Sequence, residues 1–212
     1  MGKTSPFDDS TIAYEALEFS VDGLGPWSLI VPATVYPPRE DTSILAQAIM
    51  SLDLEPSTAV EVGCGSGVLS ILLAENGWDV LAFDVNPYAV AASRSNVEES
   101  GHSNRVTVNE GGVGEPGWEV PKEAKLVVWN LPYLNPPDEG DLQLEPIEEA
   151  SMTDIADGGW SAELIRHVSG RDEDELLILL LMRNDPRSPS NKEDWIRNGW
   201  SCRVVRTLRM GD

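Results

Sequence analysis

The residues Thr58–Gly67 read TAVEVGCGSG, and this stretch decides the fold. Four of its first five residues are β-branched or apolar in the manner of a buried strand, and the apolar residues after it are spaced as in a helix. Gly63, Gly65 and Gly67 occupy alternate positions in the turn between them. Glycine permits a tight turn and lets a ligand lie against the backbone at a helix N-terminus. The stretch therefore predicts a strand, a ligand-binding turn and a helix.

Strands and helices alternate along the rest of the chain. The expected strands cover residues 58–62, 79–83, 105–109, 126–129, 175–182 and 201–207. The expected helices cover residues 67–75, 87–99, 160–168 and 192–198, and a further helix begins at about residue 42. Residues 1–35 are expected to be irregular apart from a strand-like stretch at 27–33. This alternation is typical of an α/β protein with a doubly wound, mostly parallel sheet.

The composition favours a globular protein without a membrane span. The longest apolar run, Leu176–Met182, has the length of a strand and falls short of the ~18 residues that cross a bilayer. The N-terminus has no cationic start followed by an apolar stretch, so we expect no secretion signal and a cytoplasmic location. Cys64 and Cys202 match no metal-ligand spacing, so we expect both to be buried apolar residues and no metal site.

The charge balance is unusually acidic. Asp and Glu number 36 against 15 Lys and Arg, for a formal charge of -21, and the acids are dispersed along the chain. A dispersed acidic surface suits molar salt, where self-repulsion is screened to within ~3 Å. We therefore expect a halophilic source. In ordinary salt this charge would also repel a nucleic-acid backbone, which disfavours DNA and RNA as partners.

Two carboxylates indicate which ligand the glycine turn binds. Glu61 ends the first strand, where it would repel a pyrophosphate but attract the cationic amino group and sulfonium of S-adenosylmethionine. Asp84 ends the next strand, where its carboxylate could accept hydrogen bonds from ribose hydroxyls. The alternatives are a purely structural glycine turn and a helix-capping role for Asp84, which Asn86 could fill instead. Because both carboxylates converge on the turn, we predict S-adenosylmethionine as the cofactor.

The tetrapeptide Asn130-Leu131-Pro132-Tyr133 follows a fully apolar strand and faces the same crevice. Methyl transfer needs a lone pair held in line with the sulfonium methyl group. The Asn130 side-chain oxygen and the Leu131 carbonyl could accept the N–H groups of a planar, amide-like nitrogen. Pro132 would fix the chain, and Tyr133 would offer a flat face. An ordinary X-Pro turn is the alternative, but the position favours an N-methyltransferase.

Together these residues resemble the HemK-like glutamine methyltransferases, which modify the GGQ loop of peptide chain release factors, and most of all their short archaeal and eukaryotic branch. The resemblance covers residues 35–212 and leaves residues 1–34 as an N-terminal extension. It implies a Rossmann-like class I methyltransferase domain. Val35–Thr42 (VYPPREDT) resembles the entry segment of the family, and the Asp157-Gly158-Gly159 turn resembles its paired glycines.

The resemblance also implies the site residues. The cofactor contacts would be Thr42, Glu61, Gly63, Gly65, Gly67, Asp84, Val113 and Asn130, and the substrate contacts would be Asn130, Leu131, Pro132 and Tyr133. Three features depart from the family. Leu131 replaces the first proline of its N-P-P-Y motif, Gly112-Val113 replace an acid and an apolar residue, and the chain stops where the fold adds a seventh strand.

Three functions follow as hypotheses. The first is N5-methylation of the release-factor glutamine in translation termination, with a small zinc-binding activator protein paired to the edge strand 105–109. The second is adenine-N6 methylation of DNA or RNA, which the acidic loop 134–152 disfavours because a base-flipping enzyme needs a cationic, aromatic-lined path. The third is a catalytically silent module that binds the cofactor and serves as a scaffold.

Overall fold

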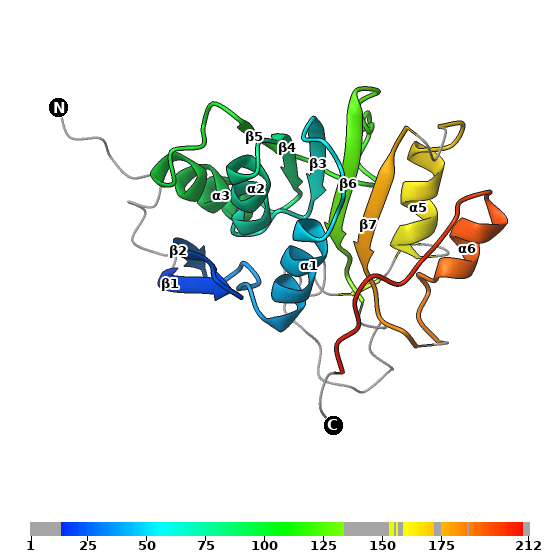
Figure 1. Ribbon diagram of the computed structural model, residues 1–212, viewed down its shortest axis with the longest axis horizontal. Coiled ribbons are helices and arrows are strands. Elements are labelled where there is room, and N and C mark those ends of the chain that lie inside the picture. The colour runs from blue at the N-terminus through cyan, green and yellow to red at the C-terminus, as the bar shows by residue number, and fades with distance from the viewer. Residues whose placement is uncertain are drawn as a thin grey trace.

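The computed structural model describes residues 14–133, 153, 154, 156, 159–171, 175–185 and 187–209. Its centre is a five-stranded sheet in the order β5-β4-β3-β6-β7, with every neighbouring pair parallel (Figure 1). The strands are β3 (Thr58–Val62), β4 (Asp79–Asp84), β5 (Val106–Glu110), β6 (Ala124–Asn130) and β7 (Leu177–Leu181). The helices are α1 (Glu40–Met50), α2 (Val68–Glu75), α3 (Pro87–Glu99), α5 (Trp160–His167) and α6 (Lys192–Arg197). The predicted doubly wound α/β fold is confirmed.

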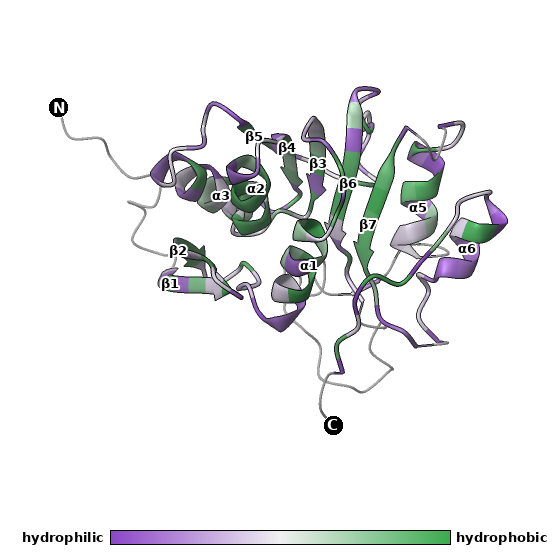
Figure 2. Ribbon diagram, viewed as in Figure 1, coloured by the Kyte–Doolittle hydropathy of each residue, from purple (hydrophilic) through white to green (hydrophobic). Residues whose placement is uncertain are grey.

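Successive strand residues point to opposite faces of the sheet, and each face has its own hydrophobic core. Ala59 and Leu126 pack with α1, α2 and α3, whereas Val60 and Val127 pack with α5 and α6. All four of these strand residues are fully buried, as expected for central parallel strands covered on both sides. Figure 2 shows these strands as mostly apolar ribbons between the two helical layers.

The strand order reverses beside β3, and this reversal determines where a binding crevice can form. The chain passes from β3 to β4 and β5 on one side of the sheet, and returns to β6 and β7 on the other. In an open parallel sheet, the loops at the carboxyl ends of the strands separate at this switch point and leave a crevice. β5 lies at one edge, as its sequence predicted.

The N-terminal region contains a structure that the sequence analysis missed. β1 (Tyr14–Val21) and β2 (Leu24–Pro32) form an antiparallel hairpin, although this region was expected to be irregular outside residues 27–33. Phe19 and Trp27 are buried and stacked, and β2 packs against α3. The Asn96 amide joins the two elements, since it accepts from the Ile30 N–H at 2.8 Å and donates to the Ile30 carbonyl at 3.0 Å.

The predicted strand at residues 201–207 was wrong. The segment is described but makes no strand pairing, and all of its side chains except the half-buried Val205 are exposed. A strand needs a hydrogen-bonded neighbour as well as β-branched residues. Cys202 is therefore exposed, contrary to expectation, whereas Cys64 is buried. The predicted strands of the central sheet and the helices at 67–75, 87–99, 160–168 and 192–198 agree with the observed bounds to within two residues. The stretch at 27–33 belongs to the longer β2, and the helix expected from about residue 42 begins at Glu40.

The helices of the described residues are too short or too polar to cross a bilayer.

Candidate active site

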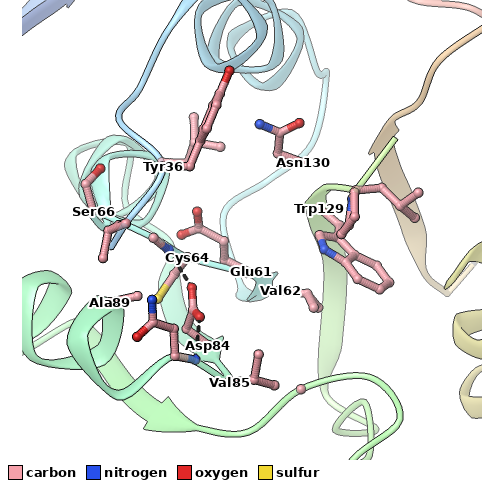
Figure 3. Close-up of a pocket in the computed structure, with 18 of the residues that line it drawn as sticks. Tyr36, Glu61, Val62, Cys64, Ser66, Asp84, Val85, Ala89, Trp129 and Asn130 are labelled. Atoms are coloured by element: carbon pink, nitrogen blue, oxygen red, sulfur yellow. Dashed lines mark hydrogen bonds between the residues drawn. The ribbon is translucent and has the colours of Figure 1, made fainter. Parts of the chain in front are cut away.

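A cavity of about 380 Å³ opens at the carboxyl ends of β3, β4 and β6. The glycine turn after β3, the loops after β4, β5 and β6, and the start of α1 form its walls. Figure 3 shows Glu61, Asp84 and Asn130 around this space. These three residues end neighbouring strands, so the topology of the sheet brings them together from positions far apart in the sequence.

The carboxylate of Asp84 holds the glycine turn in place. One of its oxygens accepts from the Gly65 N–H at 2.8 Å, and the other accepts from the Asn86 N–H at 2.9 Å. Burial raises the pKa of Asp84, and these two N–H groups oppose the rise. The capping role considered for Asp84 falls to Asn86, which accepts from the Tyr88 N–H at the start of α3. Asp84 also lines the cavity, where its remaining lone pairs can bind a ligand.

Glu61 is a buried carboxyl group at the end of β3. Burial raises its pKa to about 8, although the Ser70 hydroxyl donates a hydrogen bond to it. The charge of Asp84 raises this pKa further. A cation bound in the cavity would favour the ionised forms of both carboxyl groups, whereas a phosphate would be repelled. The walls therefore fit the cationic amino group and sulfonium of S-adenosylmethionine better than a dinucleotide.

Asn130 is held by a residue from the opposite wall. Its Nδ2 donates to the Asp41 carboxylate at 3.0 Å, and the Tyr133 hydroxyl donates to the same carboxylate oxygen at 3.4 Å. The other oxygen of Asp41 accepts from the Thr42 N–H at 2.7 Å. The side-chain oxygen of Asn130 is buried and has no hydrogen-bond partner among the described residues. A buried acceptor of this kind carries a desolvation cost that a ligand N–H would relieve.

Aromatic side chains form much of the remaining wall. Tyr36, Trp129, Tyr133 and Trp160 all line the cavity, and the Arg39 guanidinium lies 5.3 Å from the centre of the Tyr36 ring. Burial, with the Asp41 carboxylate, raises the pKa of both tyrosines, so their hydroxyl groups remain protonated near neutral pH. A wall of neutral aromatic rings lowers the local dielectric and strengthens each polar contact in the cavity.

Ten of the eleven predicted site residues line this one cavity. They are Thr42, Glu61, Gly63, Gly65, Asp84, Val113, Asn130, Leu131, Pro132 and Tyr133. Gly67 does not line it, because it packs against Ser93 of α3 instead. Asp157, Gly158 and the acidic loop 134–152 lie outside the described residues. Gly159 precedes α5 and packs against the backbone of Pro189 and Ser190.

Sequence reasoning missed the contributions of Asp41, Trp129 and Trp160. Asp41 stood only within the segment Val35–Thr42, and its hydrogen bond to a residue 89 positions away has no local signal. Trp129 and Trp160 were taken as a strand residue and a helix residue, and both belong to the second core as well as to the cavity wall. Tyr36 was included only as part of the segment Val35–Thr42, without a predicted role in the cavity wall.

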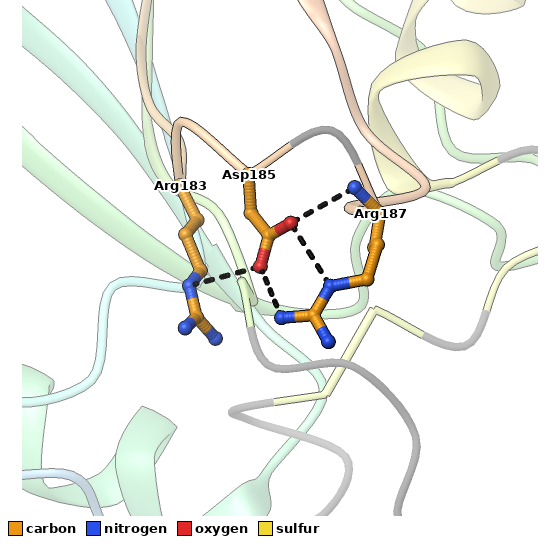
Figure 4. Close-up of polar contacts among 3 residues, drawn as sticks. All are labelled: Arg183, Asp185 and Arg187. Atoms are coloured by element: carbon orange, nitrogen blue, oxygen red, sulfur yellow. Dashed lines mark hydrogen bonds and ion pairs between the residues drawn. The ribbon is translucent and has the colours of Figure 1, made fainter.

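A cluster of charges follows β7, the neighbour of β6. Asp185 forms ion pairs with Arg183 and Arg187, and the Arg187 guanidinium lies 2.9 Å from its carboxylate (Figure 4). Hydrogen bonds from Arg187 lower the pKa of Asp185 to about 2. The carboxylate therefore stays ionised across the physiological pH range, and its ion pairs link Arg183 and Arg187 within the loop after β7.

Comparison with known proteins indicates a different family from the one that the motifs suggested. A family model described as ribosomal protein L11 methyltransferase (PrmA) matches residues 40–131. The chain is 38% identical over 68 residues to the ribosomal protein L11 methyltransferase of Vibrio campbellii, and 41% identical over 66 residues to that of Escherichia coli. These matches cover 32% and 31% of the chain but only 23% and 22% of the two relatives. The chain thus matches less than a quarter of their length.

Solved structures support the fold. A ribosomal protein L11 methylase from Lactobacillus delbrueckii superposes with a TM-score of 0.56 at 16% identity, covering 84% of this chain and 76% of that one. A tRNA (uracil-54, C5)-methyltransferase from Pyrococcus abyssi, in complex with S-adenosyl-L-homocysteine, superposes with a TM-score of 0.50 at 17% identity. That match covers 88% of this chain and 36% of the other. At these identities the likeness concerns the fold.

The resemblance to release-factor glutamine methyltransferases was therefore wrong. The family model and the curated relatives name ribosomal protein L11 methyltransferases instead. The release factor as substrate and the zinc-binding activator as partner depended on that resemblance and are withdrawn with it. The same matches give no better support to methylation of DNA or RNA. The resemblance rested on short separate segments, among them Val35–Thr42 and Asn130–Tyr133, whereas the match to the family model extends continuously over residues 40–131.

The cofactor prediction stands, because it rests on the residues of the cavity. The glycine turn and the carboxylates of Glu61 and Asp84 offer contacts to an amino acid, a sulfonium and a ribose. The chain has the Rossmann-like fold of class I methyltransferases, and its cofactor is S-adenosylmethionine.

Proposed function

We propose that this chain is an S-adenosylmethionine-dependent methyltransferase that methylates a nitrogen of ribosomal protein L11 or of a closely similar ribosomal protein. The match to the L11 methyltransferase model supports the substrate, since residues 40–131 include Asp41, Glu61, Asp84 and Asn130. The segment therefore holds both carboxylates of the cofactor wall and the polar pair that faces the substrate. We expect the reaction to take place in the cytoplasm.

The residues of the cavity would hold and orient the reactants. Bound S-adenosylmethionine supplies a methyl group on a positively charged sulfur. Asp84 keeps the glycine turn in the form that receives the cofactor, and Glu61 balances the positive charge. The aromatic wall excludes water. The Asn130 oxygen would accept an N–H of the substrate nitrogen, which directs the nitrogen lone pair. As the N–C bond forms and the S–C bond breaks, the sulfur would keep the electron pair, and the proton that the nitrogen loses would pass to solvent.

One observation carries the proposal. Asn130 lines the cavity beside the cofactor wall, and its side-chain oxygen is buried without a partner among the described residues. Buried acceptors are nearly always satisfied, and this one belongs to a residue of the cavity wall, so it can take a donor from a bound molecule. A substrate N–H is such a donor.

Transfer of radiolabelled methyl groups tests the proposal. The purified chain is incubated with labelled S-adenosylmethionine and ribosomal protein L11, and with release factor and DNA as comparison substrates. We expect label on L11, and a loss of about 100-fold in kcat for Asn130→Ala, the scale seen for one positioned polar group. Binding of S-adenosylhomocysteine should change less than threefold.

The control variant is Asn104→Ala, because Asn104 is exposed and lies between α3 and β5, away from the cavity. It should transfer label at the wild-type rate. Cofactor binding without label on any ribosomal protein would contradict the proposed activity, and it would favour the scaffold hypothesis.

A further inference from the structure

The bond between Asp41 and Asn130 joins two walls of the cavity. Asp41 belongs to the first turn of α1, and Asn130 is the last residue of β6. Asp41 is only 4% exposed, yet it lines the cavity. A buried carboxylate needs partners, and among the described residues these are the N–H and O–H donors of Thr42, Asn130 and Tyr133.

This hydrogen bond determines the orientation of the Asn130 side-chain amide. An ionised carboxylate only accepts hydrogen bonds, so the amide must present its NH₂ group to Asp41. The amide oxygen is then directed away from Asp41, and this is the oxygen that has no partner among the described residues. The opposite rotamer would place two acceptors together at the Asp41 carboxylate.

We propose that Asp41 is a positioning residue, which acts through Asn130 by fixing the amide so that an acceptor, and not a donor, meets the substrate. This inference rests on the proposed methyltransferase function and deepens it. Asp41 touches neither reactant in this role. Asp41 determines that the Asn130 side chain presents an acceptor to the substrate. An acceptor at this position selects a nitrogen that carries an N–H.

The substitution Asp41→Asn changes that polarity with little change in shape. The new amide has a single oxygen, which the Thr42 N–H engages, so its NH₂ group takes the place of the oxygen that faced Asn130. Two NH₂ groups would then face each other, and the Asn130 amide would turn over to relieve this. A donor would replace the acceptor at the substrate, so we expect kcat to fall about 100-fold.

Exchange of the two groups should restore the site. In the double variant Asp41→Asn with Asn130→Asp, the amide at position 41 donates to the carboxylate at position 130. The second oxygen of that carboxylate then lies where the Asn130 oxygen lay. The pair keeps one bond, one charge and one acceptor for the substrate. The single variant Asn130→Asp instead brings two carboxylates together and should be as inactive as Asp41→Asn.

The experiment compares five proteins: the wild type, the two single variants, the double variant and the control Asp53→Asn, which changes an exposed acid outside the cavity. Methyl transfer to L11 gives kcat and KM, and calorimetry gives the affinity for S-adenosylhomocysteine. We expect the double variant to recover at least tenfold in kcat over either single variant, with affinities within threefold throughout. A purely structural role for Asp41 would predict additive losses, so an absence of recovery would overturn the inference.

A second readout needs no substrate. The side-chain amide signal of Asn130 in a ¹⁵N–¹H spectrum is assigned by its loss in Asn130→Asp. The signal should move in Asp41→Asn, because its carboxylate partner is gone. If the wild type methylated no ribosomal protein, the proposed function would fail on its own, and this signal would still decide the role of Asp41. An unchanged signal would overturn it.

Discussion

Gly67 and Ser93 lie so close together that a side chain on the glycine has no room. A β-carbon at Gly67 would overlap the Ser93 hydroxyl oxygen and lie 3.2 Å from the Ser93 Cα atom. Gly67 is also left-handed, with a φ of 80°. The third glycine of the turn thus sets how closely the start of α2 approaches α3, although it does not line the cavity.

Gly67→Ala should destabilise the protein through both effects. We expect the free energy of unfolding to fall by about 1 kcal/mol for the left-handed backbone and by about 1–3 kcal/mol more for the overlap with Ser93. Urea denaturation measures the sum. Gly101→Ala is the matched control, because Gly101 has a φ of 79° and open space around its missing side chain. Equal losses in the two variants would show that the contact with α3 contributes nothing.

Asp84→Asn should weaken cofactor binding. An amide at this position has one acceptor oxygen, so it can serve the Gly65 N–H or the Asn86 N–H but not both. Loss of a hydrogen bond to a charged group costs about 1.5–3 kcal/mol, so we expect the Kd for S-adenosylhomocysteine to rise about tenfold or more. Calorimetry is the measurement.

The control for this variant lies on the same strand. Asp79 begins β4 at the end remote from the cavity and forms an exposed ion pair with Arg105. Asp79→Asn should leave the Kd unchanged. If both variants weakened binding equally, a general loss of negative charge would explain the effect better than the geometry of the turn.

Glu61 should make the stability of the ligand-free protein depend on pH. Its pKa rises from an ordinary value of 4.5 to about 8 on folding. Between these values the folded chain holds more protons than the unfolded chain, so this group's contribution to stability falls as the pH rises from about 4.5 to about 8 and is level above that. Glu61→Gln removes the effect, and its stability relative to the wild type should increase over that range.

Thermal unfolding of both proteins between pH 5 and pH 9 measures the difference. Glu119→Gln, which removes an exposed carboxyl group, serves as the control. A difference between Glu61→Gln and the wild type that did not change with pH would mean that burial does not raise the pKa of Glu61.

The acidic surface should make folding depend on salt. With a formal charge of -21, the folded chain repels itself over distances that are screened at molar salt but not at low salt. We expect Tm to rise by more than about 4 °C between 0.2 M and 2 M KCl, which for this size corresponds to about 1 kcal/mol or more. Sucrose raises stability without screening charge, so a rise of the same size in sucrose at 0.2 M KCl would speak against the electrostatic explanation.

The sequence predicted the central part of the fold because its signals there are local. The strand at Thr58–Val62, the glycine turn and the helix after it follow from the order of apolar residues and glycines alone. The same is true of Asp84 and Asn130, since the carboxyl ends of neighbouring parallel strands always meet. Topology then brings these residues to one cavity without any knowledge of side-chain contacts.

The sequence predicted less where pairing over long distances decides the outcome. The hairpin from Tyr14 was missed because its partner contacts lie on α3. Residues 201–207 have the composition of a strand but join no strand of the described residues. The link from Asp41 to Asn130 depends on α1 crossing to the end of β6. The predicted family was wrong because it rested on short separate segments, whereas the family model matches residues 40–131 as a whole.

The Asn96 side chain connects the N-terminal hairpin to the glycine turn. Its Nδ2 group donates to the Ile30 carbonyl of the hairpin and to the Ser66 carbonyl of the glycine turn, at 3.0 Å and 2.9 Å. A single amide of α3 thus bonds both the hairpin and the turn, so a displacement of Asn96 would break bonds of both. A ligand that holds the turn and Asn96 in place is therefore expected to slow amide hydrogen exchange in a hairpin outside the cavity.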